Sequence, residues 1–112
     1  MLTISNIHGE LIFNLNTRRF DIKNSLEFEH KLRSFNIRTA ETVLINMDGV
    51  SFVDSTGFSV LLRIQETIRK KGKKFYIINV SDEVTELIRL LKLNLVLSHT
   101  KEDRPEIAIN LK

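Results

Sequence analysis

The chain has 112 residues, 42% of them hydrophobic and 28% charged, a composition typical of one soluble globular domain. It has no cysteine, which excludes disulfides and thiolate metal sites, and no apolar run approaches the ~20 residues of a membrane helix. The formal net charge of +3 is small and dispersed, so we expect no direct nucleic-acid binding. Because the N-terminus lacks a signal-peptide pattern, we predict a cytoplasmic protein without membrane insertion.

Short apolar segments alternate with helical patterns along the chain. Residues 2–15 predict two strands joined by a turn at Gly9, residues 16–21 a loop, and residues 25–35 a helix capped by Asn24 or Ser25. The later predicted elements are a strand at 42–47, a helix at 57–71 ended by Gly72, a strand at 73–80, a helix from the cap Ser81 to about Leu91, and a last strand at 93–98.

This order of elements predicts an α/β fold with a largely parallel sheet and an antiparallel opening pair. No repeat or linker interrupts the order, so we expect a single domain over residues 1–112. The tail at 101–112 fits two interpretations. Pro105 suits the first turn of a short helix, whereas Ile107, Ile109 and Leu111 alternate as in a strand.

The sequence offers few of the groups that an enzyme needs. His8, His30 and His99 are scattered over a turn, a helix and a strand end, which argues against a catalytic triad or a clustered metal site. The chain also lacks the glycine-rich phosphate loop, the dinucleotide-binding glycine pattern and the Gly-x-Ser-x-Gly nucleophile elbow. We therefore predict a protein that is not an enzyme and that has no cofactor or metal.

The residues Asp54-Ser55-Thr56-Gly57 separate a strand-like run from the helix predicted after it. Asp, Ser and Thr are all good helix caps, so capping, worth ~1 kcal/mol, accounts for these residue types. A hydroxyl at a helix start can equally carry a phosphate, whose charge of roughly −1.5 to −2 the helix dipole partly stabilises. The residues alone leave both interpretations open.

Two apolar residues follow this element, Phe58 and Leu62, one helical turn apart. They lie off the main apolar stripe of the predicted helix, which consists of Val60, Leu61, Ile64 and Ile68. Either they form an apolar patch beside the hydroxyls, or they pack against the neighbouring helix.

A run of motifs between residues 43 and 97 matches a known pattern. A strand leads into Asp54-Ser55-Thr56-Gly57 and a helix, and Gly72, a strand, Ser81-x-x-Val84 and another helix follow. This succession resembles the STAS domain of anti-sigma-factor antagonists, and residues 10–35 resemble it more loosely. The resemblance implies a mixed sheet of four or five strands with helices mainly on one face.

The resemblance also implies a function in partner switching. Unphosphorylated antagonists bind an anti-sigma factor that is also a serine kinase of the histidine-kinase-like ATPase fold, which frees the sigma factor. The kinase then phosphorylates the serine directly after the aspartate, the complex separates, and a PP2C-type phosphatase resets the switch. Carried over to this chain, Ser55 beside Asp54 is the phosphoacceptor, with Thr56 as the fallback.

The partner-binding surface that the resemblance implies consists of Asp21, Asp54, Ser55, Thr56, Gly57, Phe58 and Leu62. Antagonists often carry Gly-Glu-[Leu/Ile]-Asp in a loop that faces the kinase. Here Phe20-Asp21 resembles the end of that motif, but Arg18-Arg19 stand in place of its Gly-Glu, which reverses the local charge from acidic to basic. Charge patterns govern the choice of partner. In the later segment, Phe58 replaces the usual Leu after Gly57.

Two other functions are compatible with the resemblance. The chain could be a non-phosphorylated accessory STAS domain of a transporter or signalling assembly, or a domain that binds a small ligand such as a nucleotide or lipid. The acceptor serine at position 55 favours the phosphorylation switch over the first alternative. No residue favours the second one specifically.

Overall fold

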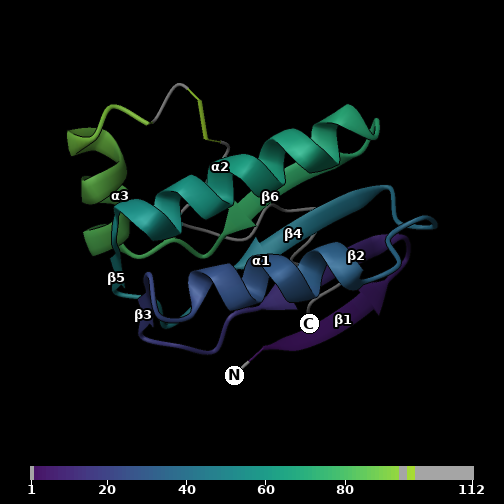
Figure 1. The fold of residues 1–112 in the computed structure, drawn as a ribbon, viewed down its shortest axis with the longest axis horizontal. Coiled ribbons are helices and arrows are strands. Elements are labelled where there is room, and N and C mark those ends of the chain that lie inside the picture. Colours follow the sequence, from purple (N-terminus) through teal and green to yellow (C-terminus); the bar gives the residue numbers. More distant parts are fainter. Residues whose placement is uncertain (1, 94–95, 98–112) are drawn as a thin grey trace.

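The computed structural model describes residues 2–93, 96 and 97, and a four-stranded sheet forms its centre (Figure 1). The strands lie in the order β1-β2-β4-β6, with the bounds Thr3–Ile7, Glu10–Asn14, Thr42–Asn46 and Lys74–Ile78. β1 and β2 form an antiparallel hairpin, whereas β2, β4 and β6 are parallel neighbours. The mixed sheet predicted from the sequence is confirmed.

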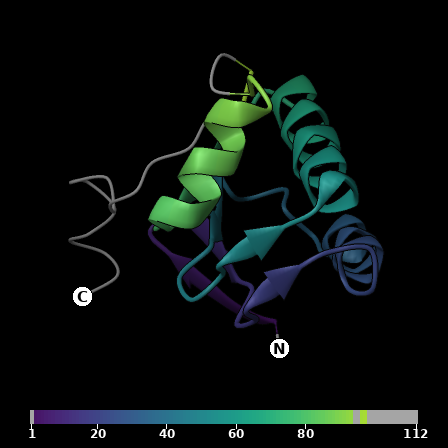
Figure 2. The ribbon, with the colours of Figure 1, turned by 90° about the vertical axis from the view of Figure 1, so that its left-hand side faces the viewer.

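Two helices connect the parallel strands and cover one face of the sheet. α1 (Ser25–Ser34) and α2 (Ser55–Lys70) lie side by side on that face (Figures 1 and 2). Because side chains alternate along a strand, every second strand residue packs under these helices. The strand residues of this main core are Leu11, Phe13, Val43, Ile45, Phe75 and Ile77, and those of a smaller cluster on alternate positions are Ile12, Leu44 and Ile78.

The third helix, α3 (Asp82–Leu90), lies at one end of the sheet (Figure 2). The side chain of Ser81 accepts a hydrogen bond from the Val84 N–H at 3.1 Å, which confirms the predicted cap. Val84 and Ile88 point into the main core, so α3 contributes one apolar face to it. The helix therefore closes the end of the core at which α2 begins.

A second, two-stranded sheet lies at the same end, and the sequence did not predict it. β3 (Arg19–Phe20) pairs in parallel with β5 (Phe52–Val53), within segments interpreted as a loop and a connection. The Arg18 carbonyl accepts hydrogen bonds from the backbone N–H groups of Ser51 and Phe52, at 2.8 and 3.3 Å. This pairing brings the turn before α1 against the start of α2.

The last predicted strand, at 93–98, is wrong for the residues that the structure describes there. Leu93, Val96 and Leu97 form a turn, in which the Leu93 carbonyl accepts the N–H groups of the other two at 3.0 and 2.9 Å. Leu97 is 2% exposed. An apolar residue is therefore needed here because the turn buries its side chain, and not because the segment is a strand. The predictions for the tail at 101–112 lie outside the described residues.

A buried carboxylate joins the two helices that cover the sheet. Glu29 of α1 accepts hydrogen bonds from Nε and Nη2 of Arg63 on α2, at 3.0 and 2.8 Å, and from Nη2 of Arg33 at 3.0 Å. The hydrogen bond from Arg63, aided by Arg33, lowers the pKa of Glu29 despite the opposing effect of burial. An ionised Glu29 therefore links α1 to α2.

Replacing Glu29 with Gln should lower the free energy of unfolding near neutral pH by about 1–2 kcal/mol, because two arginines lose a shared carboxylate. The pKa of this carboxyl is lower in the folded state. Its contribution is therefore complete above the ordinary value of about 4.3 and is lost as the pH falls through the folded value. Urea denaturation should show the full difference between wild type and variant at pH 7, and this difference should shrink once the pH falls below about 4.3.

Glu66→Gln is the matched control for this variant. Glu66 forms an exposed i, i+4 ion pair with Lys70 on α2, of the kind that contributes little. An equal loss of stability in both variants would show that the burial of Glu29 has no special effect.

Candidate functional site

The carboxylate of Asp54 connects two segments that are far apart in the sequence. Its Oδ1 accepts the Gly57 N–H at 2.8 Å, which caps α2, and its Oδ2 accepts the Ile22 N–H at 3.0 Å. Of the three predicted caps, Asp54 is therefore the one that acts, and α2 begins at Ser55 rather than at Gly57. Because both oxygens are used, one side chain fixes the turn after β3 against the start of α2.

Asp21, predicted as a partner-binding residue, organises the turn between β3 and α1. Its Oδ1 accepts the Lys23 N–H at 3.0 Å, and its carbonyl accepts the N–H groups of Asn24 and Ser25. Asn24 Oδ1 in turn accepts the Asp21 N–H at 3.0 Å. Asn24 thus stabilises the turn rather than capping α1 through its side chain, and the turn places Asp21 one residue from the Asp54 contact.

Gly57 is required by a close approach between backbones. A Cβ at this position would lie 2.4 Å from the Phe20 carbonyl oxygen and 2.8 Å from Cγ1 of Val53. Both contacts belong to the β3–β5 pair, whose backbone cannot move without breaking the pairing. The glycine in the motif therefore allows α2 to start directly on the small sheet.

The two hydroxyl residues of the motif differ in accessibility. Ser55 is exposed as the first residue of α2, whereas Thr56 is half-buried. Within the described part of the chain, the Ser55 hydroxyl has no hydrogen-bond partner, because the cap is Asp54. Of the two predicted acceptors, Ser55 is the more accessible one.

Phe58 and Leu62 follow the packing alternative rather than forming an exposed patch. Phe58 is 3% exposed within the main core, and Leu62 is half-buried against it. Both therefore belong to the core that α2 shares with the sheet, and not to a free apolar surface. The exposed apolar side chain beside Asp54 is instead Ile22, which is 61% exposed and was not predicted.

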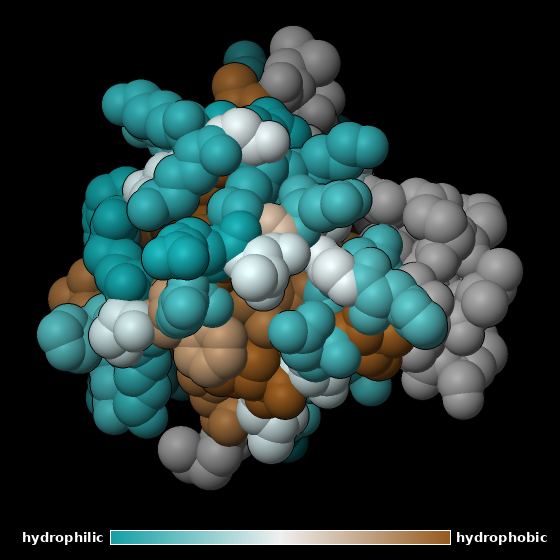
Figure 3. All heavy atoms as spheres, turned by 90° about the vertical axis from the view of Figure 1, so that its right-hand side faces the viewer, coloured by the Kyte–Doolittle hydropathy of each residue, from teal (hydrophilic) through white to brown (hydrophobic). Residues whose placement is uncertain are grey.

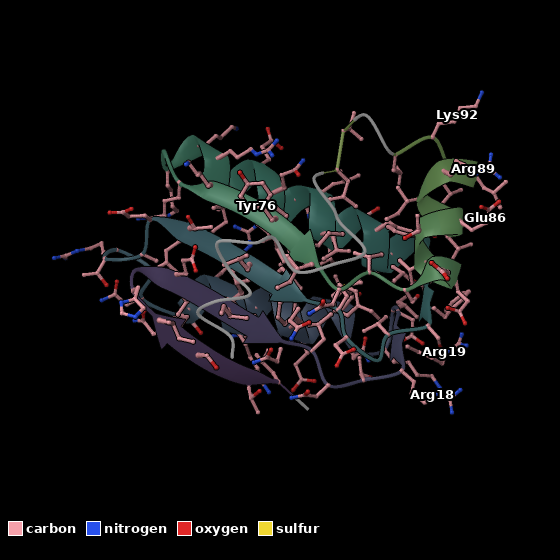
Figure 4. All side chains as sticks on the ribbon, turned by 180° about the vertical axis from the view of Figure 1, so that it is seen from behind. Arg18, Arg19, Tyr76, Glu86, Arg89 and Lys92 are labelled. Carbon is pink, nitrogen blue, oxygen red and sulfur yellow. The ribbon has the colours of Figure 1, made fainter. Side chains whose placement is uncertain are left out.

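Arginine side chains lie beside this turn. The guanidinium of Arg19 sits 4.2 Å from the centre of the Phe52 ring, and its Nε lies 3.4 Å from Oδ2 of Asp21. Figure 4 shows Arg18 and Arg19 at one end of the molecule, the end that also carries Arg89 and Lys92. The basic character of the turn could be predicted from the sequence. The stacking of Arg19 on Phe52 could not, because it depends on the pairing of β3 with β5.

A small hollow of about 120 Å³ lies next to the turn, and its lining includes Phe20, Asn24 and Phe28. Typical ligand pockets occupy roughly 300–1,000 Å³, so this hollow does not favour a nucleotide or lipid. Among the described residues, no group of three or more His, Asp or Glu side chains is arranged to hold a metal. The helices within residues 2–93 also include none that is long and apolar enough to span a membrane.

Comparison with known proteins places this arrangement in a family. Residues 2–107 match the STAS domain, and the chain belongs to the STAS domain family. The chain is 27% identical, over 73 residues, to the anti-sigma-B factor antagonist of Staphylococcus aureus, a match that covers 65% of this chain and 68% of the relative. The homology to anti-sigma factor antagonists is therefore distant.

Solved structures share the fold. The sulfate transporter family protein from Wolinella succinogenes aligns with a TM-score of 0.75 and 20% identity, covering 88% of this chain and 82% of that chain. The Bacillus cell fate determinant SpoIIAA in its phosphorylated form aligns with a TM-score of 0.68 and 15% identity, covering 99% and 98%. The STAS fold, with its mixed four-stranded sheet and three helices, is confirmed.

Replacing Gly57 with Ala should lower the free energy of unfolding by about 2 kcal/mol, because the new methyl group overlaps the Phe20 carbonyl. Thermal denaturation measures this loss. Ser59→Ala, on the exposed side of the same helix, is the control and should change stability by less than about 0.5 kcal/mol. A Gly57→Ala variant as stable as the control would refute the close approach of α2 to β3.

Replacing Asp54 with Ala should free the amides of both Ile22 and Gly57, because each loses the same acceptor. Amide hydrogen exchange should accelerate at both positions, and stability should fall by about 1–2 kcal/mol. The cap of α3 offers a control, since Ser81→Ala should accelerate exchange at Val84 and leave Ile22 unchanged. Faster exchange at Gly57 alone would show that Asp54 does not hold the turn.

Proposed function

We propose that this chain is a partner-switching module of the anti-sigma factor antagonist type, regulated by phosphorylation of Ser55. The observation that carries the proposal is the exposed hydroxyl of Ser55 next to a capping Asp54. In the unphosphorylated form, the chain binds an anti-sigma factor that is a serine kinase of the histidine-kinase-like ATPase fold. Phosphorylation of Ser55 releases that partner, and a PP2C-type phosphatase restores the binding form.

The geometry supports such a switch because it separates the cap from the acceptor. Asp54 satisfies the Gly57 N–H at the start of α2, so a phosphate on Ser55 removes no hydrogen bond among the described residues. The phosphate adds a charge of roughly −1.5 to −2 at the surface, beside the carboxylate of Asp54. The modification thus changes what a partner meets while the core stays intact.

The relatives support the same function. The Staphylococcus aureus relative is named an anti-sigma-B factor antagonist, and SpoIIAA has been solved in a phosphorylated form. On this chain, the proposed surface is centred on Ser55, with Thr56 as the fallback acceptor and Asp21 and Asp54 holding the adjacent turn. Phe58 supports that surface from below, since its side chain is buried.

The test uses purified chain with each ATPase-fold serine kinase of the same genome, first with ADP for binding and then with ATP for phosphorylation. We expect one kinase to bind the unphosphorylated chain and to place a single phosphate on Ser55, measured by mass spectrometry of peptides. Ser55→Ala should bind without being modified. Ser55→Asp should bind at least tenfold more weakly, because it places a negative charge on the contact surface.

Ser59→Asp is the matched control, because it adds the same charge on an exposed residue one turn further along α2. If Ser55→Asp and Ser59→Asp bound the kinase as tightly as wild type, phosphorylation would not be the switch. Modification of Thr56 in place of Ser55 would move the acceptor by one residue.

The structural likeness to the Wolinella succinogenes sulfate transporter family protein favours a second candidate, an accessory domain of a transport system. That function requires no modification of Ser55. Stable association with a transporter subunit, unaffected by Ser55→Asp and without phosphorylation by any kinase tested, would support it over the switch.

A further inference from the structure

Residues 18–23, which comprise β3 and the start of the turn that leads to α1, present positive charge next to Ser55. Arg18 and Lys23 are exposed, and neither side chain pairs with any residue that the structure describes. The side chain of Arg19 is 61% exposed although it pairs with Asp21. We call residues 18–23 the cationic turn.

The acids near this turn direct their charge inward. The side chain of Asp21 is 15% exposed, and it pairs with Arg19 and accepts the Lys23 N–H. Both oxygens of Asp54 accept backbone N–H groups. The three cations of the turn face a single acid within it, so its outward surface carries a net positive charge.

An apolar side chain stands among these cations. The side chain of Ile22 is 61% exposed, and the hydrogen bond from its backbone N–H to the carboxylate of Asp54 holds its backbone in place. The stacking of Arg19 on Phe52 restrains one neighbouring cation. Because these groups are already ordered, a partner that contacts them pays little conformational entropy. An exposed apolar residue ringed by charges is also the pattern of an interface anchor.

The rest of this end carries less unpaired positive charge. On α3, Glu86 and Arg89, which Figure 4 labels side by side, form an ion pair that carries no net charge. The first turn of α3 also contains two acids, Asp82 and Glu83. Apart from the exposed Lys92 after α3, the unpaired positive charge of this end therefore lies on the cationic turn, beside Asp54 and Ser55.

We propose that the cationic turn determines partner specificity, by selecting a protein surface that is acidic around an apolar socket for Ile22. The inference rests on the proposed function, and the partner is the serine kinase that phosphorylates Ser55. Opposite charges steer association, so Arg18 and Lys23 act mainly on the association rate. The buried contact of Ile22 acts mainly on the dissociation rate.

The test measures binding of the kinase, with ADP bound, to the unphosphorylated chain by surface plasmon resonance at several salt concentrations. The double variant Arg18→Glu/Lys23→Glu should associate at least tenfold more slowly at low salt, and the wild-type rate should fall as salt increases. Ile22→Ala should dissociate at least tenfold faster with little change in association. Its N–H to Asp54 remains, so the turn keeps its shape.

Two other surfaces of the domain offer matched controls. Lys71→Glu/Lys74→Glu changes the net charge by the same amount at two exposed lysines beyond the end of α2, and hydrophilic side chains dominate the upper part of that end in Figure 3. Ile4→Ala removes an exposed apolar side chain from β1. Both controls should bind within about twofold of wild type, since long-range charge effects are screened.

The outcomes separate this inference from the proposed function. If Arg18→Glu/Lys23→Glu bound the kinase with the association rate of wild type and Ser55 were still phosphorylated, the cationic turn would not determine specificity. The proposed phosphorylation switch would be unaffected by that result. Equal losses in the two double variants would also overturn it, because net charge alone would explain them. If no kinase bound or modified the wild-type chain, both the switch and this inference would fall.

Discussion

The carboxylate of Asp54 is the contact on which the geometry of the site depends. It accepts one N–H from α2 and one from the turn after β3, and its two oxygens let it serve both at once. A serine or threonine cap has a single oxygen, and an asparagine has one acceptor oxygen beside its amide nitrogen. The double contact explains why an acid stands at this position, and it leaves the hydroxyl of Ser55 outside the cap.

The body of the fold could be predicted because its physical signals are local. The run at 42–47 is short, apolar and rich in β-branched residues, the apolar stripe of α2 has helical spacing, and both elements are present. Ser81 and Gly72 mark helix ends through side-chain capping and a left-handed φ of 78°, properties of single residues. The role of Asp54 as a cap was likewise one of the open alternatives.

The small sheet and the exposure of Ile22 could not be predicted in the same way. β3 and β5 have two residues each, too few for a period, and they pair across more than thirty residues of chain. Phe58 was ambiguous because its burial depends on tertiary packing in the main core, which the spacing within α2 does not reveal. The strand predicted at 93–98 failed for a related reason, since an apolar run fits a buried turn as well as a strand.

The charge of the cationic turn changes what a phosphate would do in this protein. Three cations and one acid in residues 18–23 give the turn a formal charge close to that of a single phosphate, with the opposite sign. Under the proposed function, phosphorylation of Ser55 therefore neutralises the surface rather than adding charge to an acidic one. A partner with an acidic surface loses its electrostatic attraction when the phosphate arrives, and the same interaction accounts for both binding and release.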